Sequence, residues 1–270
     1  MHGRSPPTNG PDPLYNYDRI DAPHGLLLVD PGIRSGRIGT LSAGPSALAA
    51  GAALDHVGII PDGNRRFAER ARIGIQQAYL AAADKALEVV AWCREARVAH
   101  VSAFGVSQEN IVRRPRDELR WLHSALVYFC ECVVRLPDTG LQLFGEATAL
   151  ASDVPERDEL IRLQREAEPG GSLLVHVGVN YSSRADLEAL RRNGLGKIDG
   201  TPDRFLLSAN VPAVDLVVRT GGHRRLSGFL PVQTAYAELW FTDTLWPDLT
   251  HGEFRSALAW YARQERHFGE

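Results

Sequence analysis

From Asp55 onward, short apolar runs alternate with longer segments whose apolar residues recur at helical spacing. The apolar runs are HVGII, HVSAFGV, GLQLFGE, GGSLLVHVGVNY, VDLVV and AELWF. The segments between and after them are predicted to be helical: one or two helices at about 66–95, and one each at about 117–136, 155–168, 183–192 and 251–268. Strands that alternate with helices are typical of a mostly parallel sheet covered on both faces. We therefore expect one α/β domain over residues 55–270.

The first 54 residues lack this alternation. The stretch up to about Pro23 is rich in Pro, Gly, Asn and Asp, a composition typical of a poorly ordered tail. We expect residues 1–54 to form a partly disordered N-terminal extension that precedes the folded domain.

Composition limits the function classes and the cellular location. The net charge of -3 gives no support for a nucleic-acid-binding surface. The 3 cysteines and the lack of a secretion signal favour a reduced, cytoplasmic protein. No apolar stretch is long enough to span a bilayer, so we expect no transmembrane segment. Lys85 and Lys197 are the only lysines, and arginine is the side chain suited to bidentate contact with phosphate oxygens.

Polar side chains follow several predicted strands at the point where each strand ends. In open parallel sheets, ligands bind beyond the carboxyl ends of the strands. Those ends carry Asp62-Gly63-Asn64-Arg65-Arg66 after the first strand, Ser107, Asn110, Arg113 and Arg114 after the second, and Arg219-Thr220-Gly221-Gly222, Arg225 and Ser227 after the fifth. Arginines, hydroxyls and amides are therefore expected to gather around one carboxylate, that of Asp62.

The Asp62-Gly63-Asn64 turn opens a predicted helix. Glycine lets backbone amides approach phosphate oxygens, and a helix N-terminus favours anions. A carboxylate weakens such a site unless it holds Mg²⁺ between itself and the phosphates. The nucleotide signatures GxxxxGK[ST] and GxGxxG are absent from the sequence. Each motif alone is more often an ordinary turn, but together they predict a diphosphate site with magnesium, beside a cleft walled by the apolar helix 117–136.

Four stretches resemble motifs of the cis-prenyltransferase family, of the undecaprenyl diphosphate synthase type. They are HVGIIPDGNRRFAER, SAFGVSQENIVRRP, VNYSSRADL and VDLVVRTGGHRRLSGFLPVQTAYAELWFTDTLWPDL, of which the last is the most specific. The similarity covers about 55–270, which it identifies as a cis-prenyltransferase-like catalytic domain. The resemblance implies a homodimer that uses Mg²⁺ and isoprenoid diphosphates. No DDxxD motif is present, unlike in the trans-type prenyl synthases.

The resemblance also assigns roles to individual residues. Asp62 would hold Mg²⁺, Asn64 would assist the allylic diphosphate, and Ser107 and Asn110 would lie beside the reacting carbons. Glu238 would complete the metal site from the neighbouring subunit. The expected diphosphate contacts are Gly63, Arg65, Arg66, Arg113, Arg219, Arg225 and Ser227, the last three of which would bind the nucleophilic substrate, normally isopentenyl diphosphate.

Several family positions carry other residues in this chain. Pro61 and Phe67 stand where the family has Met and Trp. Ile75 and Tyr79 stand where it offers an Arg and a His to the allylic diphosphate. Further differences are Ile111 in place of Trp, one extra residue before Pro115, Ser182-Ser183 in place of two glycines, and His223 in place of Glu. The diphosphate site of the nucleophile is thus kept, while the allylic side is altered.

These differences favour a specialised member that makes a short, irregular product of the lavandulyl type. Phe67, Tyr79, Trp121, Tyr128 and Phe129 are candidate cleft-wall residues that would limit chain growth, and plain core packing explains the helix 117–136 aromatics equally well. Three alternatives stay open: an ordinary polyprenyl diphosphate synthase, a terpene synthase or prenyl transfer to a non-isoprenoid acceptor on the same fold, and a non-catalytic partner subunit. Partner subunits typically lose the Asp of the first motif, which this chain keeps.

Overall fold

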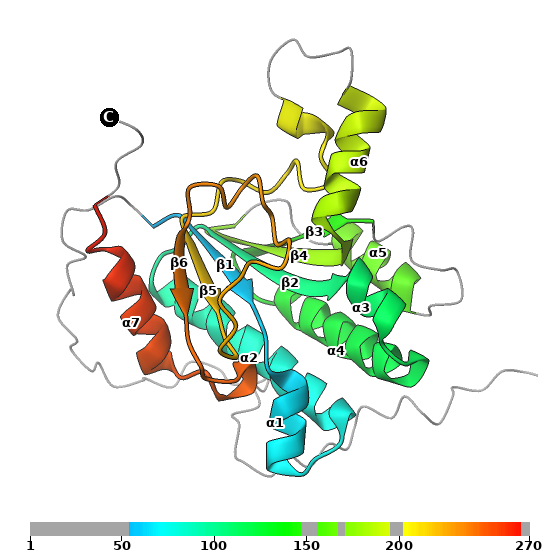
Figure 1. Cartoon of the computed structure of the whole chain (residues 1–270), viewed down its shortest axis with the longest axis vertical. Helices are drawn as coiled ribbons and strands as arrows, with labels where there is room; N and C mark the ends of the chain where they lie inside the picture. Colours follow the sequence, from blue (N-terminus) through cyan, green and yellow to red (C-terminus); the bar gives the residue numbers. More distant parts are fainter. Residues whose placement is uncertain (1–53, 147–155, 167–170, 195–201, 266–270) are drawn as a thin grey trace, which may run out of the picture. The chain divides into compact units, whose positions relative to one another are not determined.

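The computed structural model describes residues 54–146, 156–166, 171–194 and 202–265, all within the unit Ala47–Glu270. The predicted N-terminal extension lies almost wholly outside the described residues. Six strands form one sheet in the order β3-β4-β2-β1-β5-β6, and every described pairing is parallel. The strands are β1 (His56–Ile60), β2 (His100–Ser107), β3 (Thr139–Gly145), β4 (Leu173–Tyr181), β5 (Leu216–Arg219) and β6 (Glu238–Phe241). The predicted parallel α/β fold is confirmed (Figure 1).

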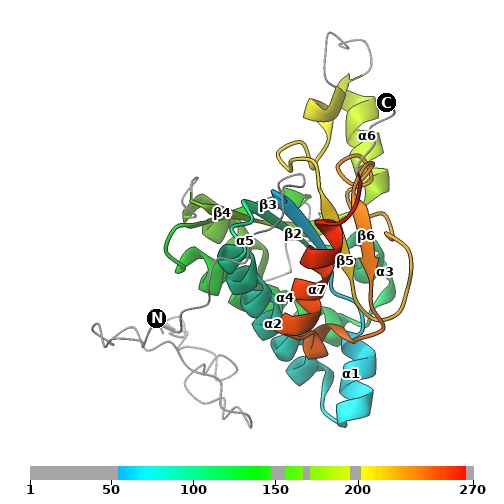
Figure 2. The same ribbon diagram turned by 90° about the vertical axis from the view of Figure 1, so that its left-hand side faces the viewer.

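Two apolar clusters cover the two faces of the sheet. Alternate strand residues such as Val57, Ile59 and Val101 join the larger cluster, which also holds buried side chains of helices α2 (Ile75–Glu95), α4 (Arg116–Val134), α5 (Glu156–Glu166) and α7 (His251–Tyr261). The smaller cluster combines Ile60, Val217 and Tyr181 with loop residues such as Phe229. This alternation follows from the period of two in a strand, where successive side chains point to opposite faces. Helix α6 (Ser183–Gly194) extends away from the sheet in both views (Figures 1 and 2).

The segment 66–95, predicted to hold one or two helices, contains two. Helix α1 (Asn64–Ala71) ends at Arg72, which adopts the left-handed conformation that stops a helix, and α2 restarts after Gly74, whose amide donates to the Gln77 Oε1 at 3.1 Å. A further short helix, α3 (Gln108–Arg113), was not predicted. The predicted helix 251–268 is shorter in the structure, since α7 ends at Tyr261. Among the described residues, no helix combines the length and hydropathy needed to cross a membrane.

Three histidines meet near the amino ends of neighbouring strands. His56 pairs in register with His100, and His176 pairs with Ser102. The His56 Nδ1 lies 3.0 Å from the Ala213 carbonyl oxygen and its Nε2 lies 2.7 Å from the Ser102 Oγ, so Nδ1 carries the proton. The His100 Nδ1 lies 3.1 Å from the His176 Nε2, and His176 Nδ1 has no hydrogen-bond partner among the described residues. Burial lowers the pKa of His56 to about 4 and that of His176 to about 3.

This cluster should make the fold sensitive to acid. In the unfolded chain the histidines bind protons near pH 6.5, whereas His56 and His176 resist protonation in the folded chain until about pH 4 and 3. Because the unfolded state binds more protons in this window, stability is full above about pH 7 and falls as the pH drops below 6.5, by roughly 1.4 kcal/mol per pH unit for each histidine. Denaturant unfolding followed by circular dichroism at a series of pH values measures this slope.

His176→Asn removes one of the titrating groups while keeping a polar side chain beside His100. We expect this variant to show a shallower loss of stability between about pH 6.5 and 4, by the contribution of one histidine. An unchanged slope would mean that the acid sensitivity arises elsewhere.

Candidate active site

Asp62 lies just beyond the carboxyl end of β1, and arginines contact both of its carboxylate oxygens. Arg66 Nη2 donates to Oδ1 over 3.2 Å, and Arg219 Nη2 donates to Oδ2 over 2.8 Å. The backbone of Asp62 is fixed by Thr220, whose Oγ1 accepts from the Asp62 amide at 3.0 Å and donates to its carbonyl at 2.8 Å. The ends of β1 and β5 therefore hold this carboxylate among cations, as the sequence predicts.

Arg219 is 4% exposed and joins Asp62 to the loop that follows β5. Its Nη1 donates to the Ser227 Oγ at 2.8 Å and also to the Arg225 carbonyl oxygen, while its Nη2 holds Asp62. The buried Nε has no hydrogen-bond partner among the described residues. An unpaired buried N–H group costs free energy, so this nitrogen favours an incoming acceptor such as a phosphate oxygen. Of the predicted residues on this loop, Ser227 binds Arg219 through its side chain, and Arg225 binds it through its backbone.

The first turn of α1 opens toward the same place. Gly63 caps the helix with a φ of 114°, and a Cβ there would lie 2.9 Å from the Leu245 side chain. Only glycine therefore suits this position. The amides of the first helical turn have no partner inside the helix and can donate to an anion. Arg66 is braced across the turn, since its Nη1 donates to the Gly221 carbonyl oxygen at 2.8 Å.

These groups surround a cavity of about 330 Å³. It is lined by Pro61, Asp62, Gly63, Asn64, Arg65, Arg66, Glu69, Arg114 and His223. Three arginines thus face two carboxylates, which leaves the cavity wall with an excess of positive charge. That charge, together with the open helix N-terminus, suits a diphosphate. The site predicted from the first motif is thereby brought together in space, with His223 beside it.

Arg114 reaches the cavity, whereas Arg113, the residue expected from the resemblance, is exposed and does not belong to the described cavity wall. The extra residue between Asn110 and Pro115 explains the difference. When the family motif is aligned forward from Asn110, its arginine falls on Arg113, and when it is aligned backward from Pro115, its arginine falls on Arg114. Pro115 directly precedes α4 in the structure. The Arg-Pro pair selects the arginine that lines this cavity, because proline fixes where the helix begins. The expected contact of Arg113 with diphosphate stays a prediction.

Ser107 and Asn110 form the cap of α3. The Ser107 Oγ accepts from the Asn110 amide at 3.1 Å, and the Asn110 Oδ1 accepts from the Ser107 amide at 3.4 Å. Neither residue is part of the described cavity wall. Since β2 is the parallel neighbour of β1, both lie at the same edge of the sheet as Asp62. The structure thus gives these residues a local structural role, and their expected role beside the reacting carbons stays a prediction.

Glu238 lies at the amino ends of the strands, whereas Asp62 lies beyond their carboxyl ends. It pairs in register with Leu216 at the start of β5, whereas Arg219 at the end of β5 pairs with Phe241. Among the described residues, no group of three His, Cys, Asp or Glu side chains is placed to hold a metal ion. Mg²⁺ is commonly bound through one or two carboxylates, water and substrate phosphates, so Asp62 in this cavity fits such a shared site. A contribution from Glu238 would require a second copy of the chain.

The expected cleft-wall residues divide into two groups. Tyr79 and Phe129 are buried in the core, so neither lines an open cleft, and core packing accounts for Phe129. Phe67, Trp121 and Tyr128 are partly buried. The Tyr128 hydroxyl donates to Asp84 Oδ1 on α2 at 2.9 Å, which ties α4 to α2. An aromatic helix face looks the same in sequence whether it packs against a neighbouring helix or lines a cleft.

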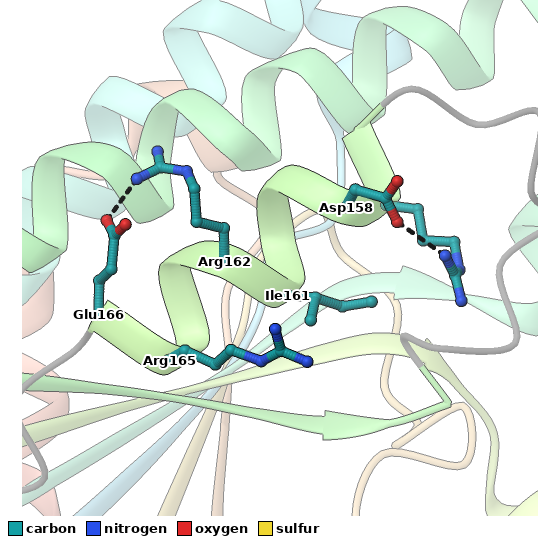
Figure 3. A pocket seen from close by; sticks show the side chains of 6 residues that line it. Asp158, Ile161, Arg162, Arg165 and Glu166 are labelled. Carbon is teal, nitrogen blue, oxygen red and sulfur yellow. Dashed lines mark hydrogen bonds and ion pairs between the residues drawn. The ribbon is translucent and has the colours of Figure 1, made fainter.

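A second cavity, of about 480 Å³, lies along α5 (Figure 3). All of its lining residues come from that helix, and none is a predicted site residue. Arg162 pairs with Glu159 and Glu166, and Arg157 pairs with Asp158 at 2.7 Å. Arg157 and Arg162 are already partnered by carboxylates of the same helix. The smaller cavity at Asp62 is therefore the better candidate for an anion site.

Comparison with known proteins agrees with the site. The sequence profile of a family described as putative undecaprenyl diphosphate synthase matches residues 60–269. A ditrans,polycis-undecaprenyl-diphosphate synthase of Xanthomonas axonopodis pv. citri is 34% identical over 228 residues, which cover 79% of this chain and 88% of that protein. An isoprenyl transferase of Aquifex aeolicus is 33% identical, over 80% of this chain and 95% of that protein.

Two solved structures share the fold. The lavandulyl diphosphate synthase of Lavandula x intermedia has a TM-score of 0.71 at 22% identity and covers 80% of this chain and 98% of its own. A probable undecaprenyl diphosphate synthase of Campylobacter jejuni has a TM-score of 0.66 at 25% identity, over 81% of this chain and 99% of its own. With the cation-rich cavity around Asp62, these similarities show that the chain belongs to the undecaprenyl diphosphate synthase family of cis-prenyltransferases.

Proposed function

We propose that the chain is a Mg²⁺-dependent prenyl diphosphate synthase that joins an allylic diphosphate to a second five-carbon diphosphate, either isopentenyl or dimethylallyl diphosphate, and makes a short, irregular product. The observation that carries the reaction type is the cavity in which Asp62 lies among Arg65, Arg66 and Arg114. A carboxylate held among arginines, as Asp62 is, suits a metal shared with a diphosphate better than it suits a free anion.

The chemistry follows from the charges around this cavity. The allylic C–O bond breaks, and the diphosphate leaves with the electron pair. The double bond of the second substrate then supplies the electrons of the new C–C bond, and a proton is lost from the adjacent carbon. Arg65, Arg66 and Arg114 hold the leaving diphosphate, while Arg219 and Ser227 bind the diphosphate of the second substrate. When bound at Asp62, Mg²⁺ supplies further neutralisation of the leaving group.

The helix packing supports a short product. Tyr79 on α2 donates to Glu118 on α4 over 2.7 Å, and Tyr128 on α4 donates to Asp84 on α2 over 2.9 Å. These two bridges tie the helices together, and the buried Phe129 joins the core between the sheet and its helices. A long hydrocarbon chain lying along α4, in the cleft expected beside that helix, would have to separate these contacts. The relatives that are 33–34% identical and named as undecaprenyl diphosphate synthases favour the ordinary polyprenyl activity instead.

Incubation with Mg²⁺ decides between these activities. The chain is given dimethylallyl diphosphate alone, with isopentenyl diphosphate, or with longer allylic diphosphates, and products are identified by mass spectrometry and NMR. We expect a short prenyl diphosphate with a branched skeleton, and no turnover when EDTA removes the metal. A long polyprenyl product would identify an ordinary polymerase, and an alcohol or a conjugate would identify a terpene synthase or transfer to another acceptor.

We also propose that the active form is a cytoplasmic homodimer. Strand β6 is an edge strand of the sheet, and Tyr236 beside it is 76% exposed, with Val232 and Leu239 also exposed. An apolar patch on a sheet edge favours association with another protein surface. Glu238 begins this same strand, at the end away from Asp62 of its own chain, so its expected metal role requires the cavity of a second copy. Light scattering on the enzyme preparation used for turnover should give twice the monomer mass, and a monomer with full activity would contradict this assembly.

A further inference from the structure

The allylic side of the cavity contains an interaction network built on Tyr79. The Tyr79 hydroxyl donates to Glu118 Oε1 at 2.7 Å and accepts a hydrogen bond from Arg114 Nη1. The same Glu118 oxygen lies 3.4 Å from Arg114 Nη1 and 3.8 Å from Arg65 Nε. The Arg114 guanidinium also lies over the Tyr79 ring, 5.7 Å from its centroid. The ring and hydroxyl of Tyr79 and the carboxylate of Glu118 therefore all contact one side of the Arg114 guanidinium.

Burial makes this network rigid. Tyr79 is 1% exposed, and Glu118 is buried with it where α2 packs against α4. The Arg114 side chain keeps 22% of its surface exposed and forms part of the cavity wall, whereas Arg65 is 67% exposed. Tyr79 and Glu118 do not contact the cavity themselves. They can affect an anion there only through the arginines that they touch.

We propose that Tyr79 and Glu118 are positioning residues that hold the Arg114 guanidinium in the orientation in which it binds the allylic diphosphate. A free arginine loses much rotamer freedom when it binds, and a guanidinium already fixed on one side loses less. The remaining N–H groups of the planar guanidinium can then face a phosphate. Glu118 also lowers the mutual repulsion of Arg65 and Arg114 while the cavity is empty. This inference rests on the proposed function for the identity of the diphosphate, but not for the binding of an anion.

A double-mutant cycle tests whether Tyr79 acts through Arg114. Tyr79→Phe removes the hydroxyl and keeps the buried ring, and Arg114→Ala removes the cation. Calorimetric titration of the full chain with inorganic diphosphate in metal-free buffer measures affinity without turnover. We expect Arg114→Ala to lower the affinity for inorganic diphosphate by about tenfold or more, and Tyr79→Phe to lower it by about fivefold. In the Arg114→Ala background, Tyr79→Phe should have no further effect.

Two control variants keep the result specific. Tyr181→Phe also removes a buried tyrosine hydroxyl that donates to a carboxylate, that of Asp186 at 2.8 Å, but away from the described cavity wall. It should lower the unfolding temperature without changing diphosphate affinity. Arg120→Ala, at an exposed arginine of α4 outside the described cavity wall, should weaken binding by at most about twofold.

Steady-state kinetics gives a second measurement. Tyr79→Phe should raise KM for the allylic diphosphate and leave KM for the second diphosphate, expected beside Arg219, unchanged. The proposal is overturned if Tyr79→Phe leaves affinity unchanged, if its effect persists without Arg114, or if Tyr181→Phe weakens binding equally. If the calorimetric pattern holds but no isoprenoid pair gives a product, the proposed function fails and the positioning role stands.

Discussion

Replacing Asp62 by asparagine should reduce the rate of prenyl transfer by about a thousandfold while the chain still folds. Asparagine has the same shape and keeps an oxygen that can accept from Arg219 or Arg66, but it carries no charge to hold a metal. The loss should appear in kcat, measured by release of diphosphate, because the charge acts on the leaving group. Circular dichroism should show the spectrum of the unsubstituted protein.

Asp62→Ala separates the structural part of this effect from the chemical part. It should lose turnover as Asp62→Asn does, and it should unfold at a lower temperature, since the buried Arg219 loses the partner that its Nη2 holds at 2.8 Å. Asp248→Asn is a matched control, because Asp248 is also a carboxylate paired with an arginine, Arg70 of α1, but it lies outside the described cavity wall. This control should keep its turnover. A chain that supports prenyl transfer equally well with alanine at position 62 would be a non-catalytic partner subunit.

Replacing Arg219 by glutamine should raise KM for the second diphosphate by about a hundredfold. Arg219 spans three acceptors, on Asp62, Arg225 and Ser227, and its Nε is left for a ligand. Hydrogen bonds from a charged donor are worth about 1.5–3 kcal/mol each, and the shorter amide replaces none of the charge. Steady-state kinetics with the allylic substrate at saturation measures the change.

Arg219→Lys shows whether charge alone is enough. A lysine ammonium is a point charge and cannot reach three acceptors in the fork geometry of a guanidinium, so we expect only a small recovery. Arg255→Gln, an exposed arginine on α7, should leave both KM values unchanged. If Arg219→Gln raised KM for the allylic substrate instead, the two diphosphates would occupy the opposite sites from those proposed.

The sequence was sufficient to predict the sheet and the cavity at its edge, because both depend on local patterns. The apolar runs such as HVGII lie where the strands lie, and the Asp62-Gly63-Asn64 turn opens a helix as its residues require. Gly63 in particular has a physical reason that is visible in the sequence, since a tight turn before a helix favours glycine. The pairing of β1 with β5, which the sequence does not specify, then places the ends of these two strands together.

What the sequence could not give depends on neighbours distant in the chain. The choice between Arg113 and Arg114 depended on where α4 begins, and Tyr79 became a buried partner of Glu118, 39 residues away. Helix α3 was missed because a Ser followed three residues later by Asn reads as an ordinary turn, although the two residues cap each other. The position of Glu238 depends on the register of β6 against β5.

The histidine cluster and the diphosphate cavity lie at opposite ends of the same short strand. His56 begins β1, Asp62 follows its end, and five residues of strand span roughly 15 Å. Substitutions that are this far apart and share no partner usually contribute additively to stability. A substitution at His56 that changes stability to acid should therefore combine additively with a change in the cavity around Asp62, so that acid stability and substrate preference can be engineered separately.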